Sequence, residues 1–174
     1  MEDIWILEKE PIRVSFSTKG YDFYKGGRGL TGLPVKAYLR LIAVKGKNKA
    51  EISSVSDLKR YVSIEKPDEA LEFVRLFTSI ETHYLFPEIH YIEPAVAVDT
   101  PRPGEYTEEY GVLMNLEKAT ARREKDYFVI ERNLLDKTGK LFRAIEHVGR
   151  DGAYSLIKKT IIVEVALISY PIYQ

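Results

Sequence analysis

The stretch from Tyr127 to Val148 reads YFVIERNLLDKTGKLFRAIEHV and predicts two strands joined by a tight turn. It is rich in β-branched and aromatic residues on both sides of the turn at 136–139, which contains Gly139. A second turn at 149–152 leads into one more strand. The predicted strands are 127–135, 140–148 and 154–170. Because strands joined by short turns pair antiparallel, we predict a C-terminal β-meander.

The N-terminal third also has the composition of strands. We predict them at 4–7, 12–16 and 35–44. The last segment is ambiguous, because its apolar residues also fit one face of a helix that begins behind Pro34. We favour a strand there.

Helices are predicted between these strand regions. Pro67 suits the first turn of a helix at 67–79, in which apolar residues recur at spacings of three and four. A shorter helix is predicted at 54–61, with Ser54 as its N-cap. The segment 116–125 has helical propensity but little apolar face, so it predicts a third helix that is exposed to solvent.

Together these elements predict the α+β class: mainly antiparallel sheet, with two or three helices packed on one face. The length of 174 residues fits a single domain that spans 1–174. Prolines and a glycine predict an irregular loop within 94–110, and this loop is the candidate boundary between two lobes.

The composition excludes several classes of site. The chain has no cysteine, which excludes disulfides, zinc–thiolate centres and thiol nucleophiles. Lysine plus arginine equals aspartate plus glutamate, at 26 each. This neutrality argues against nucleic acid as a partner, because duplex binding depends on neutralising phosphates.

The two ends of the chain bear on location. Acidic residues at positions 2 and 3 do not fit a signal peptide. The longest strongly apolar run, 160–169, is interrupted by Glu164 and is far shorter than the roughly 20 residues of a membrane helix. We therefore expect a cytoplasmic protein with no membrane partner.

The pattern Glu-x-His-Tyr-aliphatic-x-Pro occurs twice in succession, at 81–87 and 88–94. On a strand, residues at i and i+2 lie on one face roughly 7 Å apart, which lets a carboxylate and an imidazole share a divalent ion. Two copies side by side would suit Fe(II), Mn(II) or Zn(II). The candidate metal ligands are Glu81, His83, Glu88 and His90. The alternative is an exposed strand face whose tyrosines pack inward.

The segment 26–32, GGRGLTG, contains a G-x-G-x-x-G pattern. Glycines let backbone N–H groups approach a phosphate, and basic side chains add positive charge. The candidate phosphate-binding residues are Lys25, Gly27, Arg28, Gly29 and Gly32. A dinucleotide fingerprint also needs a buried strand before the glycines and a helix after them. The preceding segment 21–25 is short and polar for a central strand, so the alternative is a flexible loop between strands.

The chain is rich in tyrosine, with twelve in all, and they cluster around Tyr21 and Tyr24 and again at Tyr106 and Tyr110. Tyrosine provides rigid, amphipathic contact area at binding surfaces, although it also favours strands. No nucleophile elbow, Walker A motif, His-Glu-x-x-His or EF-hand loop occurs in the sequence.

Three functions remain open on these observations, and the sequence by itself does not decide among them. We favour a non-enzymatic interaction protein that uses a tyrosine-rich surface to bind a protein partner or a second copy of itself. The first alternative is an enzyme that depends on a divalent metal held by the Glu-x-His repeat. The second is a protein that binds phosphate or a nucleotide through the glycine segment.

Overall fold

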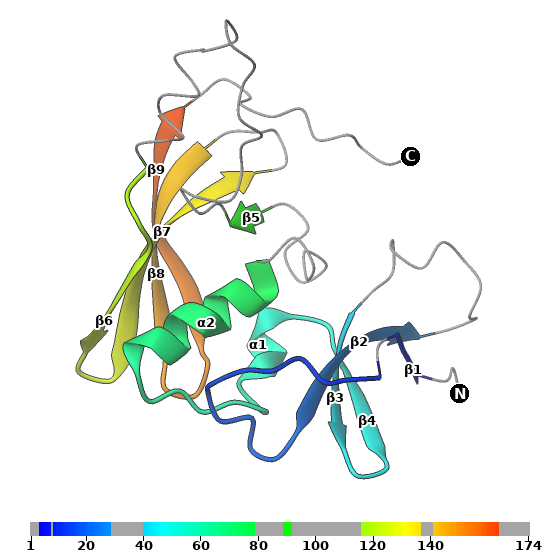
Figure 1. Cartoon of the computed structure of the whole chain (residues 1–174). Helices are drawn as coiled ribbons and strands as arrows, with labels where there is room; N and C mark the ends of the chain where they lie inside the picture. The colour runs from blue at the N-terminus through cyan, green and yellow to red at the C-terminus, as the bar shows by residue number, and fades with distance from the viewer. Residues whose placement is uncertain are drawn as a thin grey trace, which may run out of the picture.

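The computed structural model describes residues 4–7, 9–28, 40–78, 89–91, 116–136 and 141–163. They form two antiparallel sheets with two helices between them (Figure 1). The N-terminal sheet has the order β1-β2-β3-β4, from β1 (Ile4–Ile6), β2 (Asp22–Arg28), β3 (Arg40–Lys45) and β4 (Asn48–Ile52). The helices are α1 (Val55–Leu58) and α2 (Pro67–Thr78).

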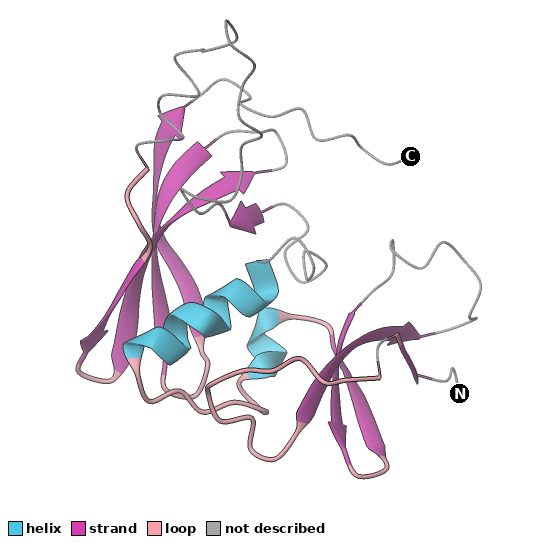
Figure 2. Ribbon diagram, viewed as in Figure 1, coloured by secondary structure: helices cyan, strands magenta, loops and turns pink. Residues whose placement is uncertain are grey.

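The C-terminal sheet has the order β5-β7-β8-β9, and β6 also pairs with β7. Its strands are β5 (Ile89–Tyr91), β6 (Thr120–Glu124), β7 (Tyr127–Asp136), β8 (Leu141–Gly149) and β9 (Tyr154–Val163). The described part of the chain is therefore mainly antiparallel sheet with few helices, and the predicted meander is confirmed as β7, β8 and β9. The difference from the prediction is that the strands divide into two sheets rather than one (Figure 2).

The segment 12–16 is not a strand, although its apolar residues predict one. It makes only one bridge, between Ile12 and Phe23. At Ser15 the backbone N–H and the hydroxyl both donate to the carboxylate of Glu72 in α2, and Phe16 is buried in the core. The segment is therefore held by a helix side chain and by its own buried ring instead of by a neighbouring strand.

The segment 116–125 also differs from its prediction, because it contains the strand β6 and no helix. β6 pairs antiparallel with the first half of β7, with Thr120 opposite Glu131 and Glu124 opposite Tyr127. An outer strand needs little apolar side-chain surface, since its hydrogen bonds to the neighbouring strand are made by the backbone. Pairing with β7 overrides the local helical propensity of this segment.

Both predicted internal helices are present, and their N-terminal residues explain where they begin. Ser54 precedes α1 in an extended conformation, and its hydroxyl donates to the carboxylate of Asp57 at 2.8 Å. In α2, Glu69 is the third residue, and its carboxylate accepts the backbone N–H groups of Glu65 at 2.8 Å and of Lys66 at 3.3 Å. The contacts of Glu69 satisfy backbone N–H groups at the start of α2. Ser54 is the predicted N-cap residue, but its side chain makes no capping hydrogen bond to the backbone of α1.

One cluster of buried apolar residues connects the two sheets through the helices. From the N-terminal sheet it includes Phe23, Leu41, Ala43 and Ile52; from α2 it includes Ala70, Phe73 and Val74; from the C-terminal sheet it includes Phe128, Ile130 and Val148. The apolar stripe of α2 therefore covers one face of the C-terminal sheet, as the sequence spacing predicts. The extent of the domain, 1–174, stays a prediction, and the loop at 94–110 lies outside the described residues.

The turn between β8 and β9 fixes the C-terminal sheet against the helical layer. Gly152 has φ +83, and a Cβ atom there would collide with Cγ2 of Val62 and lie 3.5 Å from Cζ of Phe73. The backbone N–H of Ile64 donates to the carbonyl of Arg150 at 2.8 Å in the same place. Glycine is required both by the positive φ and by this close approach.

Candidate functional site

The glycine segment begins inside a strand and not in a loop. Lys25, Gly27 and Arg28 all belong to β2, which pairs with β1 on one side and β3 on the other. The segment that seemed too short and polar for a central strand is thus an inner strand of its sheet. Gly29 and Gly32 lie outside the described residues, so phosphate binding by this segment stays a prediction.

Gly26 has a packing reason that is independent of any ligand. It lies opposite Ile6 of β1 and Arg40 of β3. A Cβ atom at this position would collide with the carbonyl oxygen of Trp5 and lie 2.9 Å from Cγ1 of Ile42. The glycine that directly precedes the G-x-G-x-x-G pattern therefore permits the close approach of β1.

Most of the Glu-x-His repeat lies outside the described residues, namely Glu81, His83 and Glu88. His90 lies in β5, where its backbone is opposite Leu135 of β7. Within the described ranges, no group of three or more His, Asp or Glu side chains is placed to hold a metal ion. A metal site on the repeat stays a prediction, and no cofactor is assigned.

The tyrosines whose side chains are described are all half-buried, and most make contacts within the molecule. The ring of Tyr21 meets that of Tyr61 edge to face at 4.9 Å between centroids. Tyr127 stacks on His147 at 4.4 Å, and the hydroxyl of Tyr154 donates to Glu146 at 2.7 Å. The contacts of Tyr127 and Tyr154 join neighbouring strands, and that of Tyr21 with Tyr61 joins the residue before β2 to the segment after α1. The cluster at Tyr106 and Tyr110 lies outside the described part of the chain.

A charged network is buried on the helix-facing side of the C-terminal sheet. Arg132 of β7 donates to Glu146 of β8 from Nε at 2.6 Å and from Nη2 at 2.8 Å, and both side chains are 0% exposed. Tyr154 of β9 donates its hydroxyl to the same carboxylate. The three residues connect three consecutive strands, and the closure of the Arg132–Glu146 pair to solvent gives the network a structural role.

This environment affects the phenol of Tyr154. Burial of the ring, followed by the negative charge of Glu146 and the hydrogen bond to it, raises the pKa of Tyr154 well above its ordinary value. A phenolate would be desolvated beside a carboxylate, so the neutral donor is the stable form. Tyr154 therefore acts as a hydrogen-bond donor here and not as a proton-transfer group near neutral pH.

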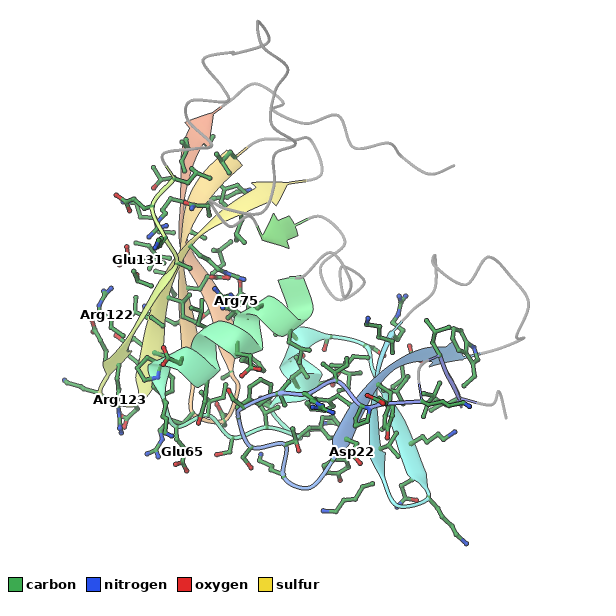
Figure 3. All side chains as sticks on the ribbon, in the orientation of Figure 1. Asp22, Glu65, Arg75, Arg122, Arg123 and Glu131 are labelled. Carbon is green, nitrogen blue, oxygen red and sulfur yellow. The ribbon has the colours of Figure 1, made fainter. Side chains whose placement is uncertain are left out.

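The opposite face of the C-terminal sheet carries polar pairs that differ in exposure. Arg122 of β6 donates to Glu131 of β7 at 2.6 Å, and the two side chains are 55% and 31% exposed. Figure 3 shows both on the side of the sheet away from α2. Arg143 donates to Asn133 at 3.2 Å on the same face. The Arg122–Glu131 charges are mutually compensated and solvated, whereas Asn133 is buried and Arg143 is 16% exposed.

The feature of the described structure that most resembles a binding surface is β9. Five large apolar residues are exposed in the described part, and four of them are on this strand: Leu156 (37%), Ile157 (53%), Ile161 (51%) and Ile162 (39%). β9 pairs with β8 on one side, and no described strand pairs with its other side. It therefore combines an open strand edge with a concentrated apolar surface.

Two irregularities in the pairing of β9 with β8 fall at two of its exposed isoleucines. Glu146 is opposite Leu156 and Ile145 is opposite Lys158, so Ile157 has no partner residue in β8. A second shift, between Phe142 and Leu141, leaves Ile162 without a partner in the same way. A β-bulge bends a strand and re-aims its side chains, and the bulged residues here are two of the exposed isoleucines.

No family model, no curated protein and no solved structure matches this chain. Neither described helix is long and apolar enough to cross a membrane. Function has therefore to be inferred from the surface itself.

The exposed face of β9 was missed by sequence reasoning. The apolar run that begins at Thr160 predicts a strand, and apolar strands are normally expected to be covered. One signal was present in the sequence: Lys158 and Lys159 interrupt the apolar residues at adjacent positions, which places a charge on each face of the strand. A strand with a lysine on both faces cannot be buried on either without leaving an ammonium in the core.

Proposed function

We propose that the protein is a non-enzymatic interaction protein that binds a partner through β9. The observation that carries this proposal is the concentration of exposed leucine and isoleucine on an edge strand. Exposed apolar patches of this kind are unfavourable in water and typically mark sites that are covered by a partner.

The tyrosine-rich surface that the sequence favours is supported less well than β9 by the described residues. Rings such as Tyr21 and Tyr61 contact each other, and Tyr154 is engaged with a buried carboxylate. The proposed contact surface is therefore the side chains of Leu156, Ile157, Ile161 and Ile162, which we call the β9 surface.

The contact is made mainly by side chains. Bulges at Ile157 and Ile162 interrupt the regular pattern of backbone groups along the strand, and this shortens the stretch that a partner strand can follow. Branched side chains that project from a rigid sheet lose little conformational entropy when they are covered, so they suit anchoring positions.

A capture experiment with matched variants tests the proposal. The full-length protein is immobilised as wild type, as Ile157→Thr/Ile161→Thr and as Leu7→Thr. Leu7 is 47% exposed and lies away from β9, so its variant controls for loss of any exposed apolar group.

We expect a polypeptide that binds the wild type and Leu7→Thr but not the double variant. Once purified, that polypeptide should show the same difference when it is added to each immobilised protein. Equal binding by all three proteins would show that the contact lies elsewhere. The thermal unfolding midpoint of each protein is measured first, so that loss of binding is compared only among folded proteins.

A further inference from the structure

Two adjacent lysines of β9 lie between the apolar residues of the β9 surface. Lys158 is opposite Ile145 and Lys159 is opposite Ala144, so their side chains project from opposite faces of the strand. Neither ammonium makes an ion pair with a carboxylate of the described residues. The ammonium of Lys159 lies 3.9 Å above the ring centroid of Phe142.

A charged neighbour on β8, Arg143, adds to this positive charge. Arg143 is opposite Thr160 and donates to the backbone carbonyls of Glu117 at 3.1 Å and of Lys118 at 3.2 Å. Its one described carboxylate partner is Glu117, at 3.5 Å, and that side chain is 82% exposed. The segment 156–162 of β9 is therefore apolar at both ends and positively charged in its middle.

We infer that the partner of the β9 surface is an acidic protein segment, with carboxylates placed between apolar side chains. This inference rests on the proposed function. Opposite charges across an interface steer association and select the partner, and apolar contacts on either side of the lysines exclude water from them. A carboxylate beside each lysine would provide the ion pairs that the described structure leaves unmade.

The same lysines disfavour a second copy of the chain as the partner. In an antiparallel pairing of two β9 strands centred on the lysines, Lys158 of one copy would face Lys159 of the other. Like charges directly opposite each other in a sheet are destabilising. Lysine on an edge strand is also a common means by which proteins prevent self-pairing, and it leaves pairing with an acidic strand favourable.

Three synthetic peptides test this inference. Each has the same isoleucine and threonine residues around a central pair that is glutamate, glutamine or lysine, and binding to the full-length protein is measured by fluorescence anisotropy. We expect the glutamate peptide to bind about tenfold more tightly than the glutamine peptide, which corresponds to two exposed ion pairs. The preference should decrease as salt is added, because exposed charges are screened.

Charge reversal provides the matched control. The variant Lys158→Glu/Lys159→Glu should prefer the lysine peptide, whereas Lys9→Glu/Lys47→Glu, with the same change in net charge at exposed positions away from β9, should keep the wild-type order. Equal binding of the glutamate and glutamine peptides would overturn the acidic partner while leaving the β9 surface itself in place. A salt-resistant dimer that Ile161→Thr abolishes would also overturn it, in favour of a second copy.

Discussion

Glu146 accepts two hydrogen bonds from the guanidinium of Arg132, and neither side chain is exposed to solvent. The pair separates two apolar regions of the same sheet face: the main core, and a smaller cluster of Leu134, Phe142 and Ala144. A buried ion pair stabilises a fold only while both partners are present, because each charge alone is strongly desolvated.

Glu146→Gln should therefore lower the free energy of unfolding by about 3–5 kcal/mol, measured by urea denaturation. Glu131→Gln is the matched control, since Glu131 also lies 2.6 Å from an arginine nitrogen but in an exposed pair. It should cost less than about 1 kcal/mol. Similar losses in the two variants would show that burial is not what makes the inner pair important.

Replacing both partners should be far less damaging than replacing one. In Arg132→Met/Glu146→Leu no buried charge is left, and apolar side chains of similar size connect the two apolar clusters. We expect most of the stability lost in Glu146→Gln to return, because such replacements are often neutral or stabilising. A double variant less stable than the single one would contradict this.

Tyr154→Phe should lower the free energy of unfolding by about 1.5–3 kcal/mol at pH 7, because it removes a hydrogen bond to a charged acceptor. Burial beside Glu146 raises the pKa of Tyr154 in the folded protein, so the folded state keeps this proton to higher pH than the unfolded state does. The stability of the wild type should consequently fall as the pH rises above about 10, the ordinary value for tyrosine.

The variant should lose this part of the pH dependence, so its stability should fall less steeply above that pH. The difference between the ultraviolet titrations of wild type and variant isolates the phenol of Tyr154. Ionisation near the ordinary pKa while the protein is still folded would contradict the prediction.

Gly152→Ala and Gly46→Ala should separate backbone strain from steric collision. Both glycines have positive φ, +83 and +60, but only Gly152 is packed against neighbours, whereas a Cβ at Gly46 would have nothing within 4 Å. Gly46→Ala should cost about 1 kcal/mol for the left-handed conformation. Gly152→Ala should cost about 2–4 kcal/mol, since overpacking against Val62 is added. An equal loss of unfolding free energy in the two variants would mean that the turn at Gly152 can move away from Val62 without cost.

Glu69→Ala should lower the free energy of unfolding by about 1 kcal/mol, because two backbone N–H groups at the start of α2 lose their acceptor. Glu69→Gln should retain most of the stability, since an amide oxygen accepts the same bonds. Urea denaturation of the two variants checks this, and a Gln variant as unstable as the Ala variant would point to charge rather than hydrogen bonding.

The parts of the fold that were predicted correctly are those in which local signals agree. Pro67 and the apolar spacing place α2 within one residue of its observed end, and the turn at 149–152 separates β8 from β9 as expected. β6 and β2 were missed because their strand character comes from pairing with neighbours. Thr120–Glu124 has no apolar alternation, and β2 includes Gly26, which the close approach of β1 explains.

The β9 surface was not predicted from the sequence, which favoured a tyrosine-rich surface instead. Ile157 and Ile162 lie at bulges, and a bulge is a property of the register between two strands that neither sequence reveals alone. The adjacent Lys158 and Lys159 were the local hint. Tyrosine content is an ambiguous signal for a binding surface. An amphipathic ring such as that of Tyr154 can donate to a buried carboxylate as well as contact a partner.

The contact between Gly26 and the carbonyl of Trp5 bears on how mutational scans of such proteins are interpreted. A scan for protein abundance should find Gly26 intolerant of every larger residue, and Gly26 directly precedes a motif that is associated with nucleotides. Gly26 would be intolerant even with no nucleotide bound, because a larger residue would disrupt the close pairing of β1 with β2. Only positions whose substitution changes ligand occupancy at constant abundance would identify a nucleotide site.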